Sequence, residues 1–208
     1  MKLYFVRHGR TVWNLEGRFQ GAGGDSPLLP ESIDTLKELG QYLKDIPFDK
    51  IYSSDLPRAV KSAEIIQSQL IHPCPLESVP ELREWHLGKL EGLKLATLNA
   101  IYPQQIQAFK TNLAKFDTSM FEAESLYSTT QRTIQFIKSL KNSKSEHILL
   151  VGHGANLTAS LRTLIGYKEA LLRKDGGLAN ASLTIIETDD FETFTLKTWN
   201  DTSYQKNN

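Results

Sequence analysis

The sequence is poor in several features that would each have narrowed its function. Cys74 is the only cysteine among 208 residues, which excludes an intramolecular disulfide and a cysteine metal site. No stretch approaches the roughly 18 apolar residues of a membrane-spanning helix. The N-terminus lacks the basic segment and long apolar core of a signal peptide. We therefore expect a cytoplasmic protein.

An excess of charge of one sign is also missing. Lysine plus arginine and aspartate plus glutamate each number 24, so the formal net charge is zero. A neutral chain offers no general electrostatic attraction for nucleic acid or an anionic membrane, and we expect neither partner. Any basic character must be local, as at a phosphate pocket. The 40% hydrophobic and 23% charged residues are typical of an ordinary globular domain.

Hydrophobic patterning predicts strands that alternate with helices. Short apolar runs and alternating runs indicate strands at residues 3–6, 48–53, 147–151, 180–187 and 192–199. Helical spacing lies between them, at residues 31–45, 57–70, 94–116, 124–140 and from His153 to about Gly166. The proline-rich residues 71–81 predict a connecting loop.

This alternation predicts an α/β fold. We expect a three-layer sandwich, with a mostly parallel central sheet, helices on both faces and an antiparallel edge from the C-terminal hairpin. Residues 1–208 are expected to form one domain. Within it, residues 94–123 are expected to form a helical insertion or cap over the site.

Two of the apolar runs end in a histidine-glycine pair, Arg7-His8-Gly9 and Gly152-His153-Gly154. A third run leads through Ser53-Ser54 into Asp55-Leu56-Pro57-Arg58. Ligands of open α/β sheets bind outside the carboxyl ends of the strands, so these residues are expected to converge on one crevice. Two imidazoles and two guanidiniums in one crevice suggest a phosphoryl-transfer site.

Each of these residue types has a function in transfer from a phosphate monoester. A neutral imidazole such as His8 can attack phosphorus and form a phosphoramidate that water later cleaves. Arg7 and Arg58 would disfavour the imidazolium form, and their planar guanidiniums suit phosphate oxygens. His153 could donate a further hydrogen bond to those oxygens. One histidine-glycine pair alone is weak evidence; the two pairs together with the arginines carry the hypothesis.

The pattern resembles the histidine phosphatase superfamily, which has the phosphoglycerate mutase-like fold. The blocks that carry the resemblance follow in family order, as Arg7-His8-Gly9-Arg10-Thr11-Val12-Trp13-Asn14, Gly17-Arg18-Phe19-Gln20-Gly21, Ser53-Ser54-Asp55-Leu56-Pro57-Arg58-Ala59, Leu82-Arg83-Glu84 and Val151-Gly152-His153-Gly154.

The resemblance implies a function for each matching residue. His8 would be the phosphorylated nucleophile, and Arg7, Arg58 and His153 would form the phosphate pocket. Glu84 would be the proton donor to the leaving group and then the base for water. The residues alone do not single out Glu84 among the carboxylates. The positions expected to bind phosphate or substrate are Asn14, Gln20, Gly21, Gly154 and Ala155.

The chain also departs from the family pattern at several positions. Ala22-Gly23-Gly24 is one residue longer than the usual spacing, and Leu90 stands where tryptophan is frequent. Ala123-Glu124-Ser125 replaces a common Gly-Glu-Ser. These departures flank the expected pocket, so they bear on the substrate rather than on the chemistry.

We therefore expect a metal-independent phosphomonoester hydrolase of small phosphorylated metabolites that needs no cofactor. Fructose 2,6-bisphosphate, a phosphoglycerate and α-ribazole phosphate all remain candidate substrates, and a homodimer is left open. The first alternative is a mutase dependent on 2,3-bisphosphoglycerate, although such mutases typically carry Thr-Gly-Trp where this chain has Gln20-Gly21-Ala22. A non-catalytic phosphate-binding scaffold is the second. A metal hydrolase using His8 and His153 is disfavoured, because the arginines would repel a cation.

Overall fold

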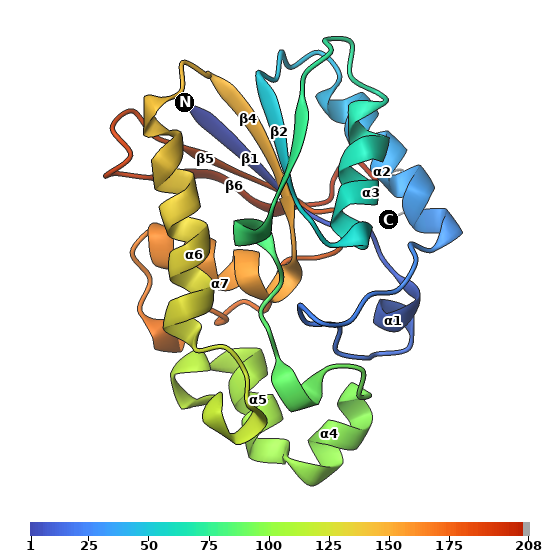
Figure 1. The fold of residues 1–208 in the computed structure, drawn as a ribbon, viewed down its shortest axis with the longest axis vertical. Helices are drawn as coiled ribbons and strands as arrows, with labels where there is room; N and C mark the ends of the chain where they lie inside the picture. The colour runs from blue at the N-terminus through green and yellow to red at the C-terminus, as the bar shows by residue number, and fades with distance from the viewer. Residues whose placement is uncertain (206–208) are drawn as a thin grey trace.

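The computed structural model describes residues 1–205, which fold around one sheet (Figure 1). The strand order in this part of the chain is β3-β2-β4-β1-β5-β6. The first four strands are mutually parallel, and β5 runs antiparallel to β1 and β6. The strand bounds are β1 (Lys2–Arg7), β2 (Lys50–Ser54), β3 (Leu76–Val79), β4 (His147–Gly152), β5 (Leu183–Glu187) and β6 (Thr195–Asp201). The predicted mostly parallel sheet with an antiparallel edge is confirmed.

Helices cover both faces of this sheet (Figure 1). One pair, α2 (Pro30–Leu43) and α3 (Pro57–Gln67), packs on one face, and the pair α6 (Leu126–Ser139) and α7 (Gly154–Leu164) packs on the other. The remaining helices are α1 (Val12–Leu15), α4 (Leu95–Ile101) and α5 (Pro103–Thr111). Among residues 1–205, none of the helices has both the length and the apolar character needed to cross a bilayer.

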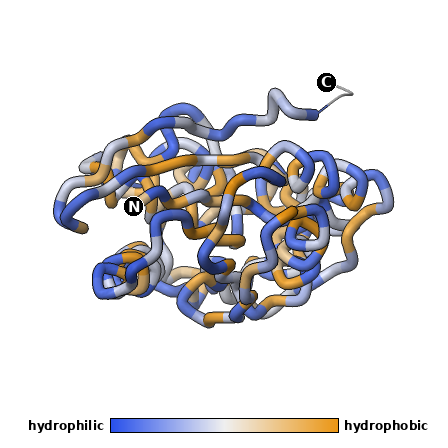
Figure 2. Tube along the Cα trace, turned by 90° about the horizontal axis from the view of Figure 1, so that it is seen from above, coloured by the Kyte–Doolittle hydropathy of each residue, from blue (hydrophilic) through white to orange (hydrophobic). Residues whose placement is uncertain are grey.

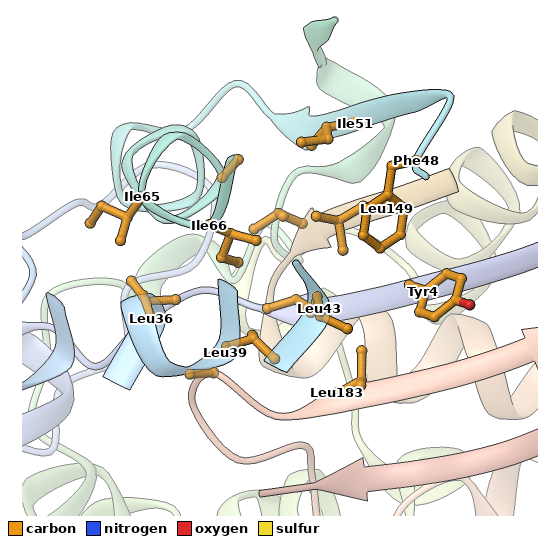
Figure 3. Close-up of a cluster of buried hydrophobic side chains, with 14 of the residues drawn as sticks. Tyr4, Leu36, Leu39, Leu43, Phe48, Ile51, Ile65, Ile66, Leu149 and Leu183 are labelled. Atoms are coloured by element: carbon orange, nitrogen blue, oxygen red, sulfur yellow. The ribbon is translucent and has the colours of Figure 1, made fainter. Parts of the chain in front are cut away.

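Strand β1 explains why the core divides into two layers. Tyr4 and Val6 pack towards α2 and α3, whereas Leu3 and Phe5 pack towards α6 and α7. Successive side chains of a strand point to opposite faces, so a continuous apolar run fills both layers. Figure 3 shows the first layer, where leucines of α2 and isoleucines of α3 meet side chains of the sheet. In Figure 2 the coils of the helices alternate between hydrophobic and hydrophilic residues, as amphipathic helices do.

A third apolar cluster lies beyond the carboxyl ends of the strands. It combines Trp85 and Leu87 with side chains of α4, α5 and the short 3-10 helices that follow them. Trp85 is fully buried there, and its ring contacts Phe109 and Phe116. Residues 94–111 therefore share an apolar cluster with other segments at the end of the sheet, where Figure 1 places α4 and α5.

The sequence-based prediction was wrong for residues 71–81, which contain β3 rather than only a loop. This strand lies at the edge of the sheet and is half exposed, so it lacks a buried apolar run. Pro75 precedes it and Pro80 follows it, and edge strands are where the sheet tolerates proline. The helical spacing at residues 94–116 corresponds to two helices, because the first ends at Ile101 and Pro103 begins the second.

Candidate active site

The register of β1 and β4 brings the two histidines together. Arg7 is paired with Gly152, so His8 and His153 leave adjacent parallel strands at the same level. The backbone N–H of His8 donates to the carbonyl oxygen of Gly152 at 2.9 Å. The ring centres of His8 and His153 lie 5.2 Å apart, and both side chains are buried. The convergence expected at this edge of the sheet is observed.

His8 is held as a neutral imidazole with one defined tautomer. Its Nδ1 lies 2.7 Å from the carbonyl oxygen of Gly9, and a carbonyl can only accept, so Nδ1 carries the proton. The unprotonated nitrogen is then Nε2, which keeps its lone pair. Burial lowers the pKa of His8 well below 6.5, and the charges of Arg58 and Arg7 lower it further. At neutral pH the His8 ring is therefore uncharged.

His153 is neutral for similar reasons but has a different set of partners. Burial lowers its pKa well below 6.5, and Arg58 contributes in the same direction. Its Nε2 lies 2.7 Å from Oγ of Ser54, which also accepts from the backbone N–H of Leu56. If the Ser54 hydroxyl donates to Nε2, Nδ1 carries the ring proton. That Nδ1 is buried and has no hydrogen-bond partner within residues 1–205.

Arg7 and Arg58 combine structural contacts with unpaired buried nitrogens. Arg7 donates from Nη1 to the carbonyl oxygen of Leu178 at 2.6 Å, while its buried Nε finds no partner in residues 1–205. The Nε of Arg58 is likewise buried and unpaired there. A Cβ on Gly154 would lie 2.8 Å from Nε of Arg7, so only glycine fits beside this guanidinium. Unpaired buried donors point to an anion as their partner.

Arg58 also clamps the loop whose length departs from the family spacing. Its Nη1 donates to the carbonyl oxygen of Gly24 at 2.7 Å and to the carboxylate of Asp25 at 2.8 Å. Its Nη2 donates to the carbonyl oxygen of Gly21 at 2.7 Å. The extra residue in Ala22-Gly23-Gly24 is therefore accommodated in a loop that stays hydrogen-bonded to Arg58.

Glu84 lies at the amino end of α7, between the sheet and the third apolar cluster. Its Oε1 accepts from the backbone N–H groups of Asn156 at 2.7 Å and Trp85 at 2.8 Å. Its Oε2 accepts from the N–H of Ala155 at 3.0 Å. The first N–H groups of a helix lack partners within the helix, which makes them suitable donors to a carboxylate. The carboxylate predicted only from the resemblance thus lies in the same pocket as His8.

Arg132 braces the segment that carries Glu84, and sequence reasoning missed it. Its guanidinium donates to the backbone carbonyl oxygens of Glu81, Arg83 and Glu84 and forms an ion pair with Glu124 at 3.1 Å. The only sequence signal was Glu124 itself, which stands in the Ala-Glu-Ser variant of a family block. Arg132 thereby fixes where the Glu84 carboxylate lies.

The polar residues predicted to bind substrate take part in internal networks. Oδ1 of Asn14 accepts from the backbone N–H of Thr11 at 3.2 Å and completes the cap of α1. Nε2 of Gln20 donates to the Thr11 hydroxyl at 2.9 Å, and its Oε1 accepts from Ser26 at 3.1 Å. Asn14, Gln20 and Gly21 all line the pocket. The hydrogen bonds of Asn14 and Gln20 are typical of capping and loop residues.

The pocket has a second side, formed by residues outside the histidine-bearing edge. It encloses a cavity of about 200 Å³, which suits a small metabolite better than the 300–1,000 Å³ of drug-sized ligands. Besides the residues already described, the lining includes Arg18, Phe19, Leu87, Phe109, Arg173 and Leu178. Sequence reasoning did not identify Arg173, which lies outside every motif. Within residues 1–205 no cluster of three or more histidine, cysteine or carboxylate side chains is arranged to hold a metal ion.

Comparison with known proteins agrees with this geometry. The family model of the histidine phosphatase superfamily (branch 1) matches residues 3–202. The probable phosphoglycerate mutase GpmB of Proteus mirabilis is 33% identical, over 90% of this chain and 85% of its own. The metal-independent phosphoserine phosphatase of Arabidopsis thaliana is 29% identical, over 98% of this chain and 82% of its own. The solved structure of YhfR from Bacillus stearothermophilus superposes with a TM-score of 0.88 at 29% identity, covering 98% of both chains.

These matches extend over nearly the whole chain and fit the arrangement of His8 and His153 on adjacent strands. The relatives include proteins named as mutases and as phosphatases, so the similarity fixes the type of enzyme and not the substrate. The chain belongs to the histidine phosphatase superfamily (branch 1) and is an enzyme of that type.

Proposed function

We propose that the protein is a metal-independent phosphomonoesterase of small phosphorylated metabolites that works through a phosphohistidine on His8. The observation that carries this proposal is a buried, neutral His8 with its Nε2 unprotonated, in one pocket with two guanidiniums and Glu84. Nucleophilic catalysis needs an activated nucleophile, and phosphoryl transfer needs cations on the non-bridging oxygens.

In the first step, Nε2 of His8 attacks phosphorus and a P–N bond forms while the ester P–O bond breaks. Glu84 donates a proton to the leaving oxygen, and the alcohol departs. Arg7 and Arg58 stabilise the charge on the equatorial oxygens, and His153 donates a further hydrogen bond from Nδ1. The unpaired donors on these three side chains support this assignment.

In the second step, water attacks the phosphohistidine. The Glu84 carboxylate takes a proton from the water, the P–N bond breaks and inorganic phosphate leaves. Cleavage of the P–N bond returns the lone pair to Nε2 of His8, and the proton taken from water returns Glu84 to the carboxylic acid, so both residues regain their starting states. The contacts of Glu84 with the amino end of α7 keep it beside the pocket for both steps.

We further propose that residues 94–123 form the cap over this site. Phe109 of α5 lines the pocket, and α4 and α5 share the third apolar cluster with Trp85 and Leu87. Such a cap would limit the size of the leaving group and exclude bulk water from the first step.

The test is a substrate panel with the purified protein in EDTA. The panel contains p-nitrophenyl phosphate, 3-phosphoglycerate with and without 2,3-bisphosphoglycerate, fructose 2,6-bisphosphate and several sugar and nucleoside monophosphates. We expect phosphate release that EDTA does not reduce, together with an acid-labile phosphoenzyme. Conversion of 3- to 2-phosphoglycerate with little phosphate release would instead make the protein a mutase, the activity for which its Proteus mirabilis relative is named.

A further inference from the structure

Arg173 is a cation in the pocket whose guanidinium has no hydrogen-bond or ion-pair partner among residues 1–205. Arg7, Arg18 and Arg58 line the same pocket, and each donates hydrogen bonds to protein oxygens. Among residues 1–205, no hydrogen bond or ion pair involves the Arg173 guanidinium, and its Nε is buried. Its central carbon lies 4.4 Å from the ring centre of Phe109, which holds the guanidinium against the face of the ring.

The loop that carries Arg173 is anchored on both sides. On one side, Arg162 donates from Nη1 to the carbonyl oxygen of Leu172 at 3.0 Å and from Nη2 to Asp175 at 3.0 Å. On the other side, the N–H of Leu178 donates to the Thr158 hydroxyl at 3.1 Å. The guanidinium is therefore held in place, and a partly buried charge is normally paired. An anionic group of the ligand is the partner that this arrangement lacks.

The charges around Arg173 indicate which part of the ligand would carry this anionic group. Burial lowers the pKa of Arg173 to about 10, so it remains a cation at neutral pH; Glu84 opposes the shift, and Arg7 adds to it. The lowered pKa values of His8 and His153 arise instead from burial together with Arg58 and Arg7. Arg173 therefore lies near both Glu84 and Arg7, and its stacking on Phe109 of α5 places it against the proposed cap, on the side of the leaving group.

We propose that Arg173 selects phosphomonoesters whose leaving group carries a second acidic group, a carboxylate or a second phosphate. This inference rests on the proposed function, because Glu84 marks the side of the leaving group only if it is the proton donor. A planar guanidinium can bind either anion through two parallel hydrogen bonds. Phe19, Leu87 and Phe109 in the same lining would contact the short carbon skeleton between the two anions.

The test compares matched substrates that differ only in the second charge. One pair is 3-phosphoglycerate and glycerol 3-phosphate, in which a hydroxymethyl group replaces the carboxylate. The other is propane-1,3-diol bisphosphate and its monophosphate. We expect the wild type to prefer the doubly acidic member of at least one pair, which identifies the second group. In Arg173→Gln that preference should fall by about 10- to 100-fold in kcat/KM, mostly through KM, and Arg173→Lys should restore part of it.

The matched control is Lys174→Gln, which removes a charge from the next residue. Lys174 is exposed and lies 5.2 Å from the ring centre of Tyr167, outside the pocket lining. This variant should keep the wild-type preference. An unchanged preference in Arg173→Gln would overturn the inference, and so would equal losses on both members of a pair, since Arg173 would then act on the shared phosphate or on folding.

A binding measurement separates this inference from the proposed function. In the His8→Ala background, calorimetry measures the Kd of 3-phosphoglycerate and of propane-1,3-diol bisphosphate with and without Arg173→Gln. If the wild type turns over none of the substrates but Arg173→Gln weakens binding about tenfold or more, the proposed function fails and the anion site stands. If turnover occurs and binding is unaffected, the anion site fails alone.

Discussion

The two sides of the pocket are built differently. One side is the carboxyl edge of the sheet, where strand register places His8 beside His153 and the histidine contacts are short and buried. The other side is formed outside the sheet, by connections that carry Phe19, Leu87 and Arg173 and by helix α5, which carries Phe109. Regular elements hold side chains in fixed geometry, whereas connections vary in length and direction. In the function proposed above, the first side carries out the chemistry and the second side selects the leaving group.

The difference is also visible in the hydrogen bonds. At the sheet edge, Arg58 uses both Nη atoms on the protein, and Arg7 uses Nη1. On the other side, Arg173 has no such bonds among the described residues. An arginine that is hydrogen-bonded to the protein can bind the phosphate group that all phosphomonoester substrates share. A guanidinium without such bonds can bind a second anionic group that only some substrates carry.

Replacing His8 should cause the largest loss of activity, because it removes the chemistry of the sheet-edge side completely. His8→Ala removes the nucleophile, so kcat should fall at least about 10³-fold on every substrate, whatever its leaving group. The measurement is steady-state kinetics on p-nitrophenyl phosphate and on the best substrate of the panel. His72→Ala, in an exposed loop, is the matched control and should keep wild-type kinetics. Substantial residual turnover with His8→Ala would require a different nucleophile.

Replacing Glu84 should give the second-largest loss of activity. It sharpens the comparison of the two sides, because Glu84 would donate its proton to the leaving group that the second side binds. Glu84→Gln should lower kcat/KM by about 10²- to 10⁴-fold for alkyl phosphates, which need an acid for the departing alkoxide. The loss should be far smaller for p-nitrophenyl phosphate, whose leaving group needs little protonation. We use kcat/KM because it reports the steps up to departure of the alcohol.

The control for this prediction is Glu77→Gln, which alters an exposed carboxylate of β3 far from the pocket lining. It should leave the dependence on leaving-group pKa unchanged. Equal losses on alkyl and aryl phosphates in Glu84→Gln would contradict the proton-donor role. They would leave Glu84 only as a group that positions α7 through the N–H bonds it accepts.

The same division explains what could be predicted from the sequence. The buried strands and the His-Gly pairs at their ends are local patterns, so the fold and the meeting of His8 with His153 follow from the sequence. The edge strand β3 was missed because it is half exposed and bounded by prolines. The four-residue helix α1 was missed because it is shorter than one amphipathic repeat.

The residues on the second side could not be predicted for a different reason. Arg173 and Phe109 are 64 positions apart, and only the tertiary structure places the guanidinium on the ring. Arg173 belongs to no motif, and Phe109 lies in the helical pattern of residues 94–116, which predicts a helix but not a pocket. Arg132 likewise reaches three backbone carbonyls about 50 positions away. Such contacts depend on how connections fold back, which single-sequence patterns do not encode.

The smallest expected effect is on stability, and it concerns the sheet-edge side alone. The pKa values of His8 and His153 are lowered well below 6.5 by burial and by the arginines, so both rings stay neutral in the folded state while unfolded imidazoles take up protons near pH 6.5. The unfolded state then binds more protons than the folded state. The free energy of unfolding should therefore rise with pH in this window and fall as the pH drops below about 6.5.

Thermal unfolding at pH 7.5, 6.5 and 5.5 tests this expectation. The wild type should lose melting temperature on acidification, and His8→Gln should lose clearly less, because one of the two buried imidazoles is gone. His72→Gln should follow the wild type, since that side chain is exposed and its loop lies away from the pocket. Parallel slopes for His8→Gln and the wild type would mean that His8 gains its proton as easily in the folded state as in the unfolded one. The arginines and burial would then not hold His8 neutral. The contrast between the sheet-edge side, which carries the nucleophile, and the other side, which selects the substrate, would lose its electrostatic basis.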